Sequence, residues 1–364
     1  MAWFSPFMRV GSRGKPNGDL ISPRLKSWAL FCQNDVQAIP PQPETRRHRG
    51  DDDAMTEILR PDLAGIDRAA TLLRSGGLVA IPTETVYGLA ADACNGAAVA
   101  RIYAAKGRPS FNPLIVHLAE TQQARRYGLW SDLAEVLATA FWPGPLTLVL
   151  PLAPDHGLSS LVTAGLNSVA IRVPALDAAH QVLTAFGGPV AAPSANPSGR
   201  ISATTARHVL DGLGGKIDAV LDAGPCPVGL ESTIIGLHTP RPTLLRAGGL
   251  PVEAIEAALG EPLEIANGAE IIAPGQLASH YAPNARVRLN ALSANPGEVM
   301  LGFGPVDGDL NLSPTGDLIE AAAHLFDHLH ALDAMDKPIA VAPVPDHGLG
   351  RAINDRLERA AAPR

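Results

Sequence analysis

Apolar residues from position 66 onward alternate between the spacing of helices and that of strands. Helical spacing over 66–75 ends at Gly76 and Gly77, because the left-handed backbone that closes a helix favours glycine. The alternation continues, with helices expected at 97–105, 131–141, 178–186 and 204–213 and strands at 78–81, 114–118, 146–150, 168–173, 190–192, 219–223, 232–237 and 243–246. Interleaved helices and strands predict an α/β fold. Several strands lie too close in sequence for a crossover helix, so we expect a mixed sheet.

The pattern divides the chain into four parts. Residues 1–54 keep no apolar period and are expected to be a disordered N-terminal extension. Alternatives are a start placed upstream of Met55, and a targeting peptide, which the missing apolar core and the acidic residues disfavour. The other parts are a first α/β domain (55–259), a polar interdomain linker (260–284) and a smaller C-terminal α/β domain with the order strand, strand, helix, strand, helix (285–364).

Composition narrows the class of protein. Of the 364 residues 46% are apolar, so the chain can bury a large core. The net charge is −7, and few residues are aromatic, which disfavours a general nucleic-acid-binding surface. Three widely spaced cysteines without a CxxC motif argue against a disulfide scaffold or a common zinc site and favour a cytoplasmic location. No apolar run is long enough to predict a membrane span.

Common nucleotide-binding and hydrolase signatures are absent from the sequence. The segment at 214–217 lacks the spacing and hydroxyl of a P-loop, and the glycines at 302–308 do not fit GxGxxG. There is no GxSxG motif. Candidate chemistry must therefore come from other polar residues.

Polar residues cluster in loops next to apolar strands. Hydroxyls in 82–88 can bind a small polar ligand or form an ordinary turn. Lys106 and Arg108, held by Gly107 and Pro109, suit an anion such as phosphate, although cations near a helix C-terminus are also stabilised there without a ligand. Arg172 lies within an apolar strand and needs a partner, either an internal carboxylate or a ligand carboxylate.

Further clusters lie later in the chain. The segment 193–199 follows a strand and precedes a helix, where backbone donors and hydroxyls suit phosphate. Glu231 to Thr233, then Arg246, and finally Ser279 to Pro283 add further polar groups. Each cluster is weak evidence by itself.

Together and in this order, the motifs closely resemble the Sua5/YrdC family of L-threonylcarbamoyladenylate synthases. The matching segments are PTETVYG, KGRP with NPLIVH, WPGPLTLVL, VAIRVP, APSANPSG, ESTII and LLRAGG, over about residues 60–250. The segment SHYAP and the second domain indicate the long, Sua5-type form. The resemblance implies a YrdC-like twisted mixed sheet with an open, positively charged cavity, followed by a smaller Rossmann-like domain.

The resemblance also implies a reaction. L-threonine, bicarbonate and ATP would give threonylcarbamoyl-AMP and diphosphate, with Mg2+ accompanying ATP, so the chain would be a nucleotidyltransferase. The product would serve tRNA processing, as the precursor of threonylcarbamoyladenosine at tRNA position 37. The downstream tRNA threonylcarbamoyl transferase machinery is therefore an expected partner, and direct tRNA binding stays open.

Site residues follow from the matched motifs. The resemblance implies catalytic roles for Lys106 and Arg108, which would neutralise charge as the carbamate meets the α-phosphate. The implied threonine-binding residues are Thr85, His117, Arg172, Ala192 and Ser232. The implied ATP-binding residues are Arg108, Asn112, Ser168, Ser194, Asn196, Ser202, Arg246 and Tyr281.

Three other hypotheses compete with this one. An RNA-binding module without catalysis would need a more basic, more aromatic surface. A carbamoyl-adenylate domain of the hydrogenase-maturation type shares the fold but would occur with acylphosphatase and zinc-finger segments that this sequence lacks. His324 and His328 have the i, i+4 spacing of a metal pair, but with Asp327 and His330 on a polar helix face we expect them to be solvated.

Overall fold

The computed structural model describes residues 55–239, 241–266, 273–275 and 279–363; the extension expected at 1–54 lies outside them. The helices are α2 (Leu63–Arg74), α3 (Gly96–Lys106), η1 (Thr121–Arg126), α4 (Asp132–Phe141), α5 (Ser160–Thr163), α6 (Asp177–Phe186), α7 (Ala206–Leu213), α8 (Val252–Leu259), α9 (Leu318–Asp333) and α10 (Leu349–Ala361). The strands are β1 (Glu57–Leu59), β2 (Val79–Ile81), β3 (Gly88–Asp92), β4 (Ile115–His117), β5 (Leu146–Pro151), β6 (Ser168–Arg172), β7 (Val190–Ala191), β8 (Ala219–Leu221), β9 (Thr233–Gly236), β10 (Thr243–Arg246), β11 (Glu264–Ile265), β12 (Val287–Arg288), β13 (Val299–Gly302), β14 (Leu310–Asn311) and β15 (Ile339–Val341).

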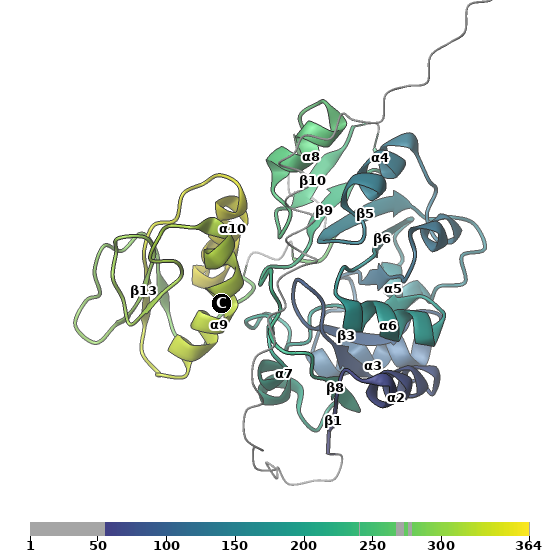
Figure 1. Cartoon of the computed structure of the whole chain (residues 1–364), viewed down its shortest axis with the longest axis horizontal. Helices are drawn as coiled ribbons and strands as arrows, with labels where there is room; N and C mark the ends of the chain where they lie inside the picture. The colour runs from purple at the N-terminus through teal and green to yellow at the C-terminus, as the bar shows by residue number, and fades with distance from the viewer. Residues whose placement is uncertain (1–54, 240, 267–272, 276–278, 364) are drawn as a thin grey trace, which may run out of the picture. The chain divides into compact units, whose positions relative to one another are not determined.

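A large mixed sheet forms the first part of the fold (Figure 1). Within the described residues it contains eleven strands in the order β1-β8-β2-β3-β7-β4-β6-β5-β9-β10-β11. The sheet contains parallel pairs such as β4 with β6 and antiparallel pairs such as β5 with β6. The predicted α/β class and mixed sheet are confirmed.

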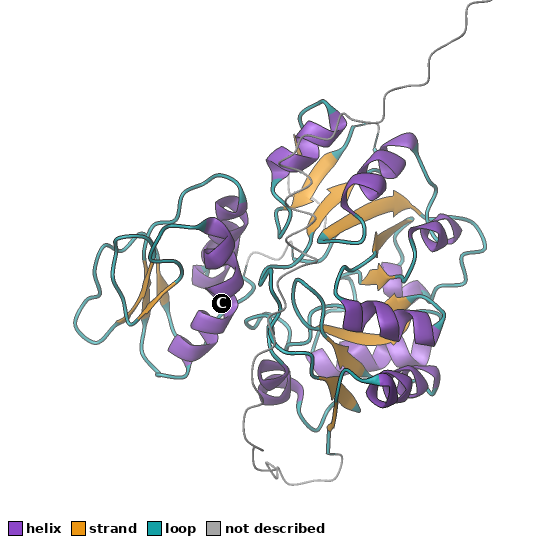
Figure 2. Cartoon of the chain, in the orientation of Figure 1, coloured by secondary structure: helices purple, strands orange, loops and turns teal. Residues whose placement is uncertain are grey.

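A second, smaller sheet follows along the chain. Its four described strands run in the order β12-β15-β13-β14, and every pair is parallel. The helices α9 and α10 pack against each other and against this sheet, as the separate colours of helix and strand make visible (Figure 2). The predicted smaller C-terminal α/β domain is confirmed, and β14 is an additional strand.

Several short elements escaped the sequence pattern. The strands β1 and β3 were not expected, and β11 lies within the segment 260–284 that was expected to be a linker. The sequence of β3, GLAAD, is rich in alanine, which has little preference for strands. Antiparallel pairing with β2 on one side and β7 on the other makes it a strand. Tertiary pairing, rather than local preference, determines this element.

The end of α3 shows how the local sequence places a cavity residue. The side chain of Asn95 caps the helix by accepting hydrogen bonds from the backbone N–H groups of Ala97 and Ala98. The helix ends at Lys106 because Gly107 takes the left-handed conformation, with φ at 59°. The next residue, Arg108, is thereby directed out of the helix into the loop that borders the cavity described below.

One apolar cluster joins the C-terminal domain to loops of the large sheet. Phe326 and Leu329 of α9 belong to the same buried cluster as Val86, Leu230 and Tyr281. Val86 lies between β2 and β3, and Leu230 precedes β9. The core of the C-terminal domain therefore continues up to the loops that carry the predicted site residues.

The polar face of α9 corrects one expectation. His330 is not simply solvated, because its Nε2 lies 3.1 Å from the backbone oxygen of Ser202 and its ring stacks on that of His208, with 3.9 Å between ring centroids. The rings of His324 and His328 stack on each other at 4.9 Å. In the described segments, no group of three or more His, Cys, Asp or Glu residues is arranged to hold a metal ion. The side of α9 that carries Asp327 and His330 packs against the large-sheet domain.

None of the described helices combines the length and the apolar character that crossing a membrane requires.

Candidate active site

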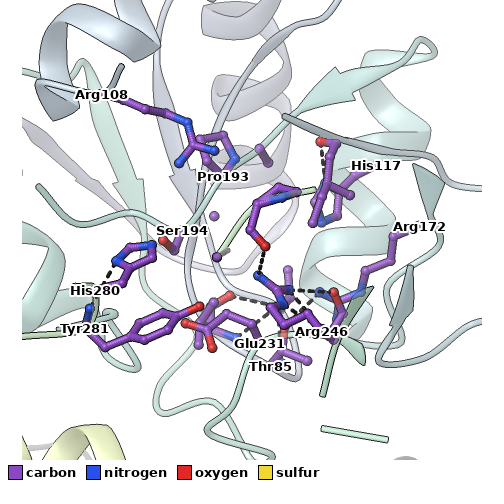
Figure 3. Close-up of a pocket in the computed structure, with 18 residues that line it drawn as sticks. Thr85, Arg108, His117, Arg172, Pro193, Ser194, Glu231, Arg246, His280 and Tyr281 are labelled. Carbon is purple, nitrogen blue, oxygen red and sulfur yellow. Dashed lines mark hydrogen bonds between the residues drawn. The ribbon is translucent and has the colours of Figure 1, made fainter. Parts of the chain in front are cut away.

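A cavity lies among the loops at the ends of β2, β4, β7 and β10 (Figure 3). Of the residues implied by the sequence, nine line it: Thr85, Arg108, His117, Arg172, Ala192, Ser194, Ser232, Arg246 and Tyr281. The other five are not part of its lining: Lys106, Asn112, Ser168, Asn196 and Ser202. Residues from seven separate motifs, far apart in sequence, thus share one cavity.

The hydroxyl proton of Thr85 is already used in a hydrogen bond within the protein. The Oγ1 of Thr83 donates to the backbone oxygen of Val86 (2.7 Å), so it must accept at its 2.7 Å contact with Thr85 Oγ1. Thr85 Oγ1 therefore donates to Thr83 and accepts from Arg172 Nη1 at 2.8 Å. What remains is one lone pair on Thr85. This hydroxyl can accept a hydrogen bond from a ligand but cannot donate one.

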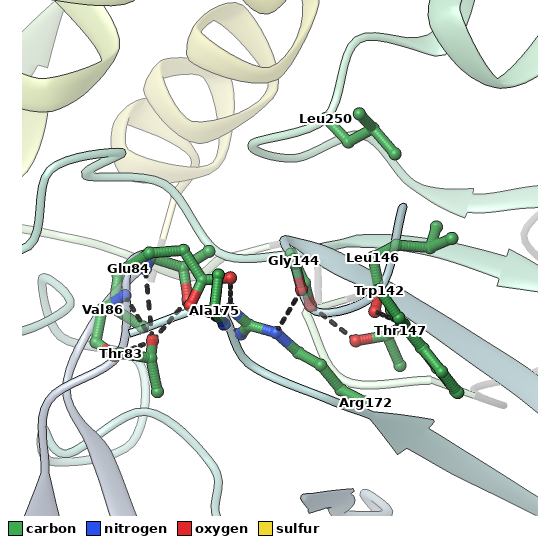
Figure 4. A network of polar contacts seen from close by, with 12 residues as sticks. Thr83, Glu84, Val86, Trp142, Gly144, Leu146, Thr147, Arg172, Ala175 and Leu250 are labelled. Carbon is green, nitrogen blue, oxygen red and sulfur yellow. Dashed lines mark hydrogen bonds and ion pairs between the residues drawn. The ribbon is translucent and has the colours of Figure 1, made fainter. Parts of the chain in front are cut away.

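Arg172 has an internal partner, one of the two possibilities that its sequence context leaves open (Figure 4). Its Nη2 lies 2.5 Å from Glu84 Oε1, and both side chains are almost fully buried. Its Nε donates to the backbone oxygen of Gly144 at 3.1 Å. The other carboxylate oxygen of Glu84 accepts from the backbone N–H of Ala175. Contacts with the described residues thus use three of the five N–H groups of Arg172, and two are left for a ligand.

His117 is a neutral acceptor in the cavity wall. Burial, together with the charge of Arg172, lowers the pKa of His117 to about 3. Its Nδ1 lies 3.2 Å from the backbone oxygen of Ile115, which requires the proton to be on Nδ1. Nε2 is therefore an unprotonated hydrogen-bond acceptor.

Lys106 and Arg108 do not point to the same place. The Lys106 ammonium donates to the backbone oxygens of Ser194 (2.6 Å) and Asn196, and burial lowers the pKa of Lys106 well below its usual range. It therefore holds the 193–199 loop in place from behind the cavity lining. Arg108 lines the cavity instead.

Arg108 is fixed by its own loop. Its Nε and Nη2 donate to the backbone oxygens of Asn112 (3.2 Å) and Pro113 (2.9 Å). Burial lowers the pKa of Arg108 to about 10, so it is charged at neutral pH. Its position is set by neutral carbonyl groups, which leaves its charge uncompensated.

Arg246 is held in a similar way on the strand β10. Its Nη2 donates to the backbone oxygen of Ser232 at 2.8 Å, and its Nη1 to that of Pro274 at 3.3 Å. The Ser232 hydroxyl lies 2.7 Å from that of Thr147. Within the described part of the chain, neither Arg108 nor Arg246 has an ion pair with a carboxylate. The cavity therefore contains two buried guanidinium groups that form no direct ion pair with a carboxylate of the described residues.

Some buried polar atoms near the cavity have no partner among the described residues. These are the hydroxyl of Tyr281, both amide atoms of Asn112 and the Oδ1 of Asn196. Buried polar atoms are nearly always hydrogen-bonded, and each unpaired one needs an explanation. A polar ligand would explain them, and all three residues belong to the set implied for ATP binding.

Glu231 lines the cavity although the sequence did not single it out as a site residue. Its Oε1 accepts from the Ser202 hydroxyl at 2.5 Å, and its Oε2 lies 2.9 Å from Nε of Arg356. The available signal was its place beside Ser232 in ESTII. Its partner Arg356 is 125 positions away, so no local pattern could predict the pair.

Ser168, the first residue of β6, is only partly buried.

Two protein-family models cover most of the chain. The model described as "telomere recombination" matches residues 71–248, and the model of the threonylcarbamoyl-AMP synthase C-terminal domain matches residues 250–362. A threonylcarbamoyl-AMP synthase of Bacillus subtilis is 40% identical over 339 residues, which span 85% of this chain and 96% of the relative. This chain belongs to the threonylcarbamoyl-AMP synthase family.

Other relatives agree with this assignment. The threonylcarbamoyl-AMP synthase of Pyrococcus abyssi is 41% identical over 318 residues, which span 80% of this chain and 93% of the relative. The crystal structure of P. abyssi Sua5 with L-threonine superposes with a TM-score of 0.78, at 38% identity, over 85% of this chain and 98% of that one. Escherichia coli YciO, at 20% identity and a TM-score of 0.50, shares the fold of part of the chain. The long, two-domain form of the synthase family is thus the one present here.

Proposed function

We propose that this chain is a threonylcarbamoyl-AMP synthase that joins L-threonine, bicarbonate and ATP and releases diphosphate. The observation that supports this most is the charge pattern of the cavity. Arg108 and Arg246 carry positive charge without a direct ion pair to a carboxylate of the described residues, while Thr85 and His117 offer neutral acceptors. Such a cavity suits a polyanion such as ATP next to a small ligand that donates hydrogen bonds.

The threonine end of the cavity would be formed by Thr85, His117 and Arg172, with Ala192 and Ser232. The amine or hydroxyl of threonine would donate to Thr85 Oγ1 and His117 Nε2, since both are acceptors only. The two unused N–H groups of Arg172 would hold the substrate carboxylate. The ion pair with Glu84 fixes that guanidinium before the substrate arrives.

The ATP end would be formed by Arg108 and Arg246, with Asn112, Ser194, Asn196 and Tyr281. Mg2+ would enter with the nucleotide, bound to its phosphates, and its charge would stabilise the diphosphate as it leaves. Ser202 supports this end through Glu231. Lys106 supports it by fixing the loop that carries Ser194 and Asn196.

The proposed reaction has two bond-forming steps. The neutral amine of threonine attacks the carbon of bicarbonate or CO2, which forms a carbamate and, from bicarbonate, releases water. A carbamate oxygen then attacks the α-phosphorus of ATP, and the bond to the β,γ-diphosphate breaks. Because the attacking and the attacked groups are both anionic, the guanidinium of Arg108 reduces the repulsion between them. Holding the two reactants together can remove roughly 7–11 kcal/mol of the barrier in favourable cases.

The product would be consumed by a reaction that transfers its threonylcarbamoyl group to an adenosine of tRNA and releases AMP. A tRNA threonylcarbamoyl transferase is therefore the proposed downstream partner.

The decisive experiment measures diphosphate release by the full chain with ATP, threonine, bicarbonate and Mg2+, and with each of these omitted in turn. The proposal expects release only when all are present, and a product with the mass of threonylcarbamoyl-AMP. Release that does not depend on threonine would contradict it, as would binding of ATP without any product.

A further inference from the structure

The C-terminal domain contributes a charged residue that supports the wall of the cavity from behind. Arg356 lies on α10, has no exposed surface, and forms an ion pair with Glu231 at 2.9 Å between Nε and Oε2. It does not line the cavity itself, whereas Glu231 does. The arginine therefore contacts this carboxylate from behind the cavity wall.

Other contacts hold Arg356 in a single position. Its Nη1 donates to the backbone oxygen of Ala247 at 2.8 Å and to Asp355 Oδ2 at 2.7 Å. Its guanidinium carbon lies 5.0 Å from the centre of the Tyr281 ring, a cation–π distance. Ala247 directly follows Arg246, so one side chain of α10 connects two motifs of the cavity.

Both carboxylate oxygens of Glu231 are occupied. Oε2 pairs with Arg356 and Oε1 accepts from Ser202. Burial opposes ionisation of Glu231, but the charges of Arg356 and Arg246 outweigh it, so the pKa of Glu231 lies below its usual value. The group is an anion in the wall of a cavity that is proposed to bind ATP.

An uncompensated carboxylate at this place would harm ATP binding in two ways. It would repel the phosphates, and it would attract Arg246, the other cation that acts on it. Among the described residues, Arg246 donates to the backbone and hydroxyl oxygens of Ser232 and to the backbone oxygen of Pro274, and to no carboxylate. The pair with Arg356 thus keeps Arg246 available for an anionic ligand.

We propose that Arg356 is a positioning residue for ATP binding: by neutralising and orienting Glu231 from the C-terminal domain, it leaves Arg246 free for the phosphates. This inference rests on the proposed function, because it takes the anion to be ATP. It gives the C-terminal domain a defined electrostatic role in the nucleotide site.

The test compares Arg356→Gln with the doubly neutral variant Glu231→Gln/Arg356→Gln in the full chain. ATP affinity is measured by calorimetry with Mg-ATP and no threonine, and KM and kcat are measured separately. For Arg356→Gln we expect about tenfold or greater loss of ATP affinity and a matching rise in ATP KM, with a much smaller change in kcat. The double variant also lacks the carboxylate of Glu231, so it should regain most of the lost ATP affinity.

The pH dependence of ATP affinity gives a second test of this proposal. In Arg356→Gln, protonation of Glu231 removes the repulsion, so the ratio of variant to wild-type ATP Kd should fall as the pH is lowered from about 8 to 6. Arg356→Lys keeps the charge and should retain more affinity than Arg356→Gln. A purely structural role would instead make the double variant at least as poor as Arg356→Gln, with a ratio independent of pH.

Arg351→Gln is the matched control. Arg351 lies on the same helix and also pairs with a glutamate of the first domain, Glu253, at 3.5 Å, but both side chains are roughly half exposed, at 40% and 49%. Its loss should leave ATP affinity unchanged. If the double variant fails to regain affinity relative to Arg356→Gln, or if Arg351→Gln has the same effect, the inference is wrong. Failure of the proposed function would look different, because wild-type protein would then lack threonine-dependent diphosphate release.

Discussion

The hydroxyl of Thr85 shows how a hydrogen-bond count predicts a role. With its proton committed to Thr83, it can only accept from a ligand. We therefore expect Thr85→Val to raise the threonine KM about tenfold, the order of magnitude of one lost hydrogen bond to a charged group, while the ATP KM changes little. Steady-state kinetics with each substrate varied in turn would measure this.

Thr163→Val is the control for that substitution. Thr163 is also buried, but its hydroxyl donates to the backbone oxygen of Ser160 away from the cavity. It should affect stability only. Equal rises in the threonine and ATP KM values of Thr85→Val would show that Thr85 shapes the cavity rather than binding threonine.

Arg172 has a structural role and a binding role, and a single substitution of this residue affects both. Arg172→Ala should raise the threonine KM and also destabilise the fold by about 3–5 kcal/mol, because it leaves Glu84 buried without a partner. Glu84→Gln/Arg172→Met should recover much of the unfolding free energy in urea, while threonine use stays impaired. A double variant as unstable as the sum of both single variants would show that the pair is not the source of the loss.

At the scale of elements, Tyr281 is the residue of most interest in the segment between β11 and β12. Its ring is packed between Arg356 and Phe326, with ring centroids of Tyr281 and Phe326 5.7 Å apart, but its hydroxyl has no partner in the described structure. Tyr281→Phe should therefore leave the unfolding free energy within about 1 kcal/mol of wild type, yet raise the ATP KM several-fold if the hydroxyl contacts the nucleotide.

Tyr87→Phe provides the contrast. The Tyr87 hydroxyl donates to the backbone oxygen of Gly224 at 2.8 Å, so its removal should cost about 1 kcal/mol of stability without altering the ATP KM. If Tyr281→Phe leaves the ATP KM unchanged, Tyr281 serves only as packing between the domains.

The sequence could predict the elements that have a clear apolar period, and it missed those that depend on neighbours. Helices such as α4 and strands such as β5 were predicted to within a residue. The strand β3 was missed because its pairing with β2 and β7 outweighs its weak strand preference. The sequence predicted that the C-terminal domain is α/β, but it did not predict the short strand β14.

The site residues show the same difference between features that are local in sequence and features that depend on the fold. Residues within distinctive motifs, such as Arg108 and His117, were found from the sequence and do line the cavity. The partners of its charged groups were not found, because Glu84 and Arg172 are 88 positions apart, and Glu231 and Arg356 are 125 apart. Local sequence shows which side chains are unusual, while the fold decides which of them neutralise each other.

At the scale of the whole molecule, buried neutral histidines link stability to pH. Burial lowers the pKa of His117 and His280 to about 3 and that of His208 to about 4. In the unfolded chain the same groups titrate near about 6.5. Between these values the unfolded state binds more protons than the folded state, so the unfolding free energy must fall as the pH falls.

We therefore expect the unfolding free energy to fall from about pH 6.5 downward, at up to about 1.4 kcal/mol per pH unit for each histidine and roughly 4 kcal/mol for the three together. Urea unfolding at a series of pH values would measure the slope. His208→Gln removes one of these groups, the one at the contact between α7 and α9, and should reduce the slope. Stability that stays constant or increases between about pH 6.5 and 5 would mean that these histidines are protonated within the fold, and that His117 is then unable to act as the neutral acceptor proposed for threonine.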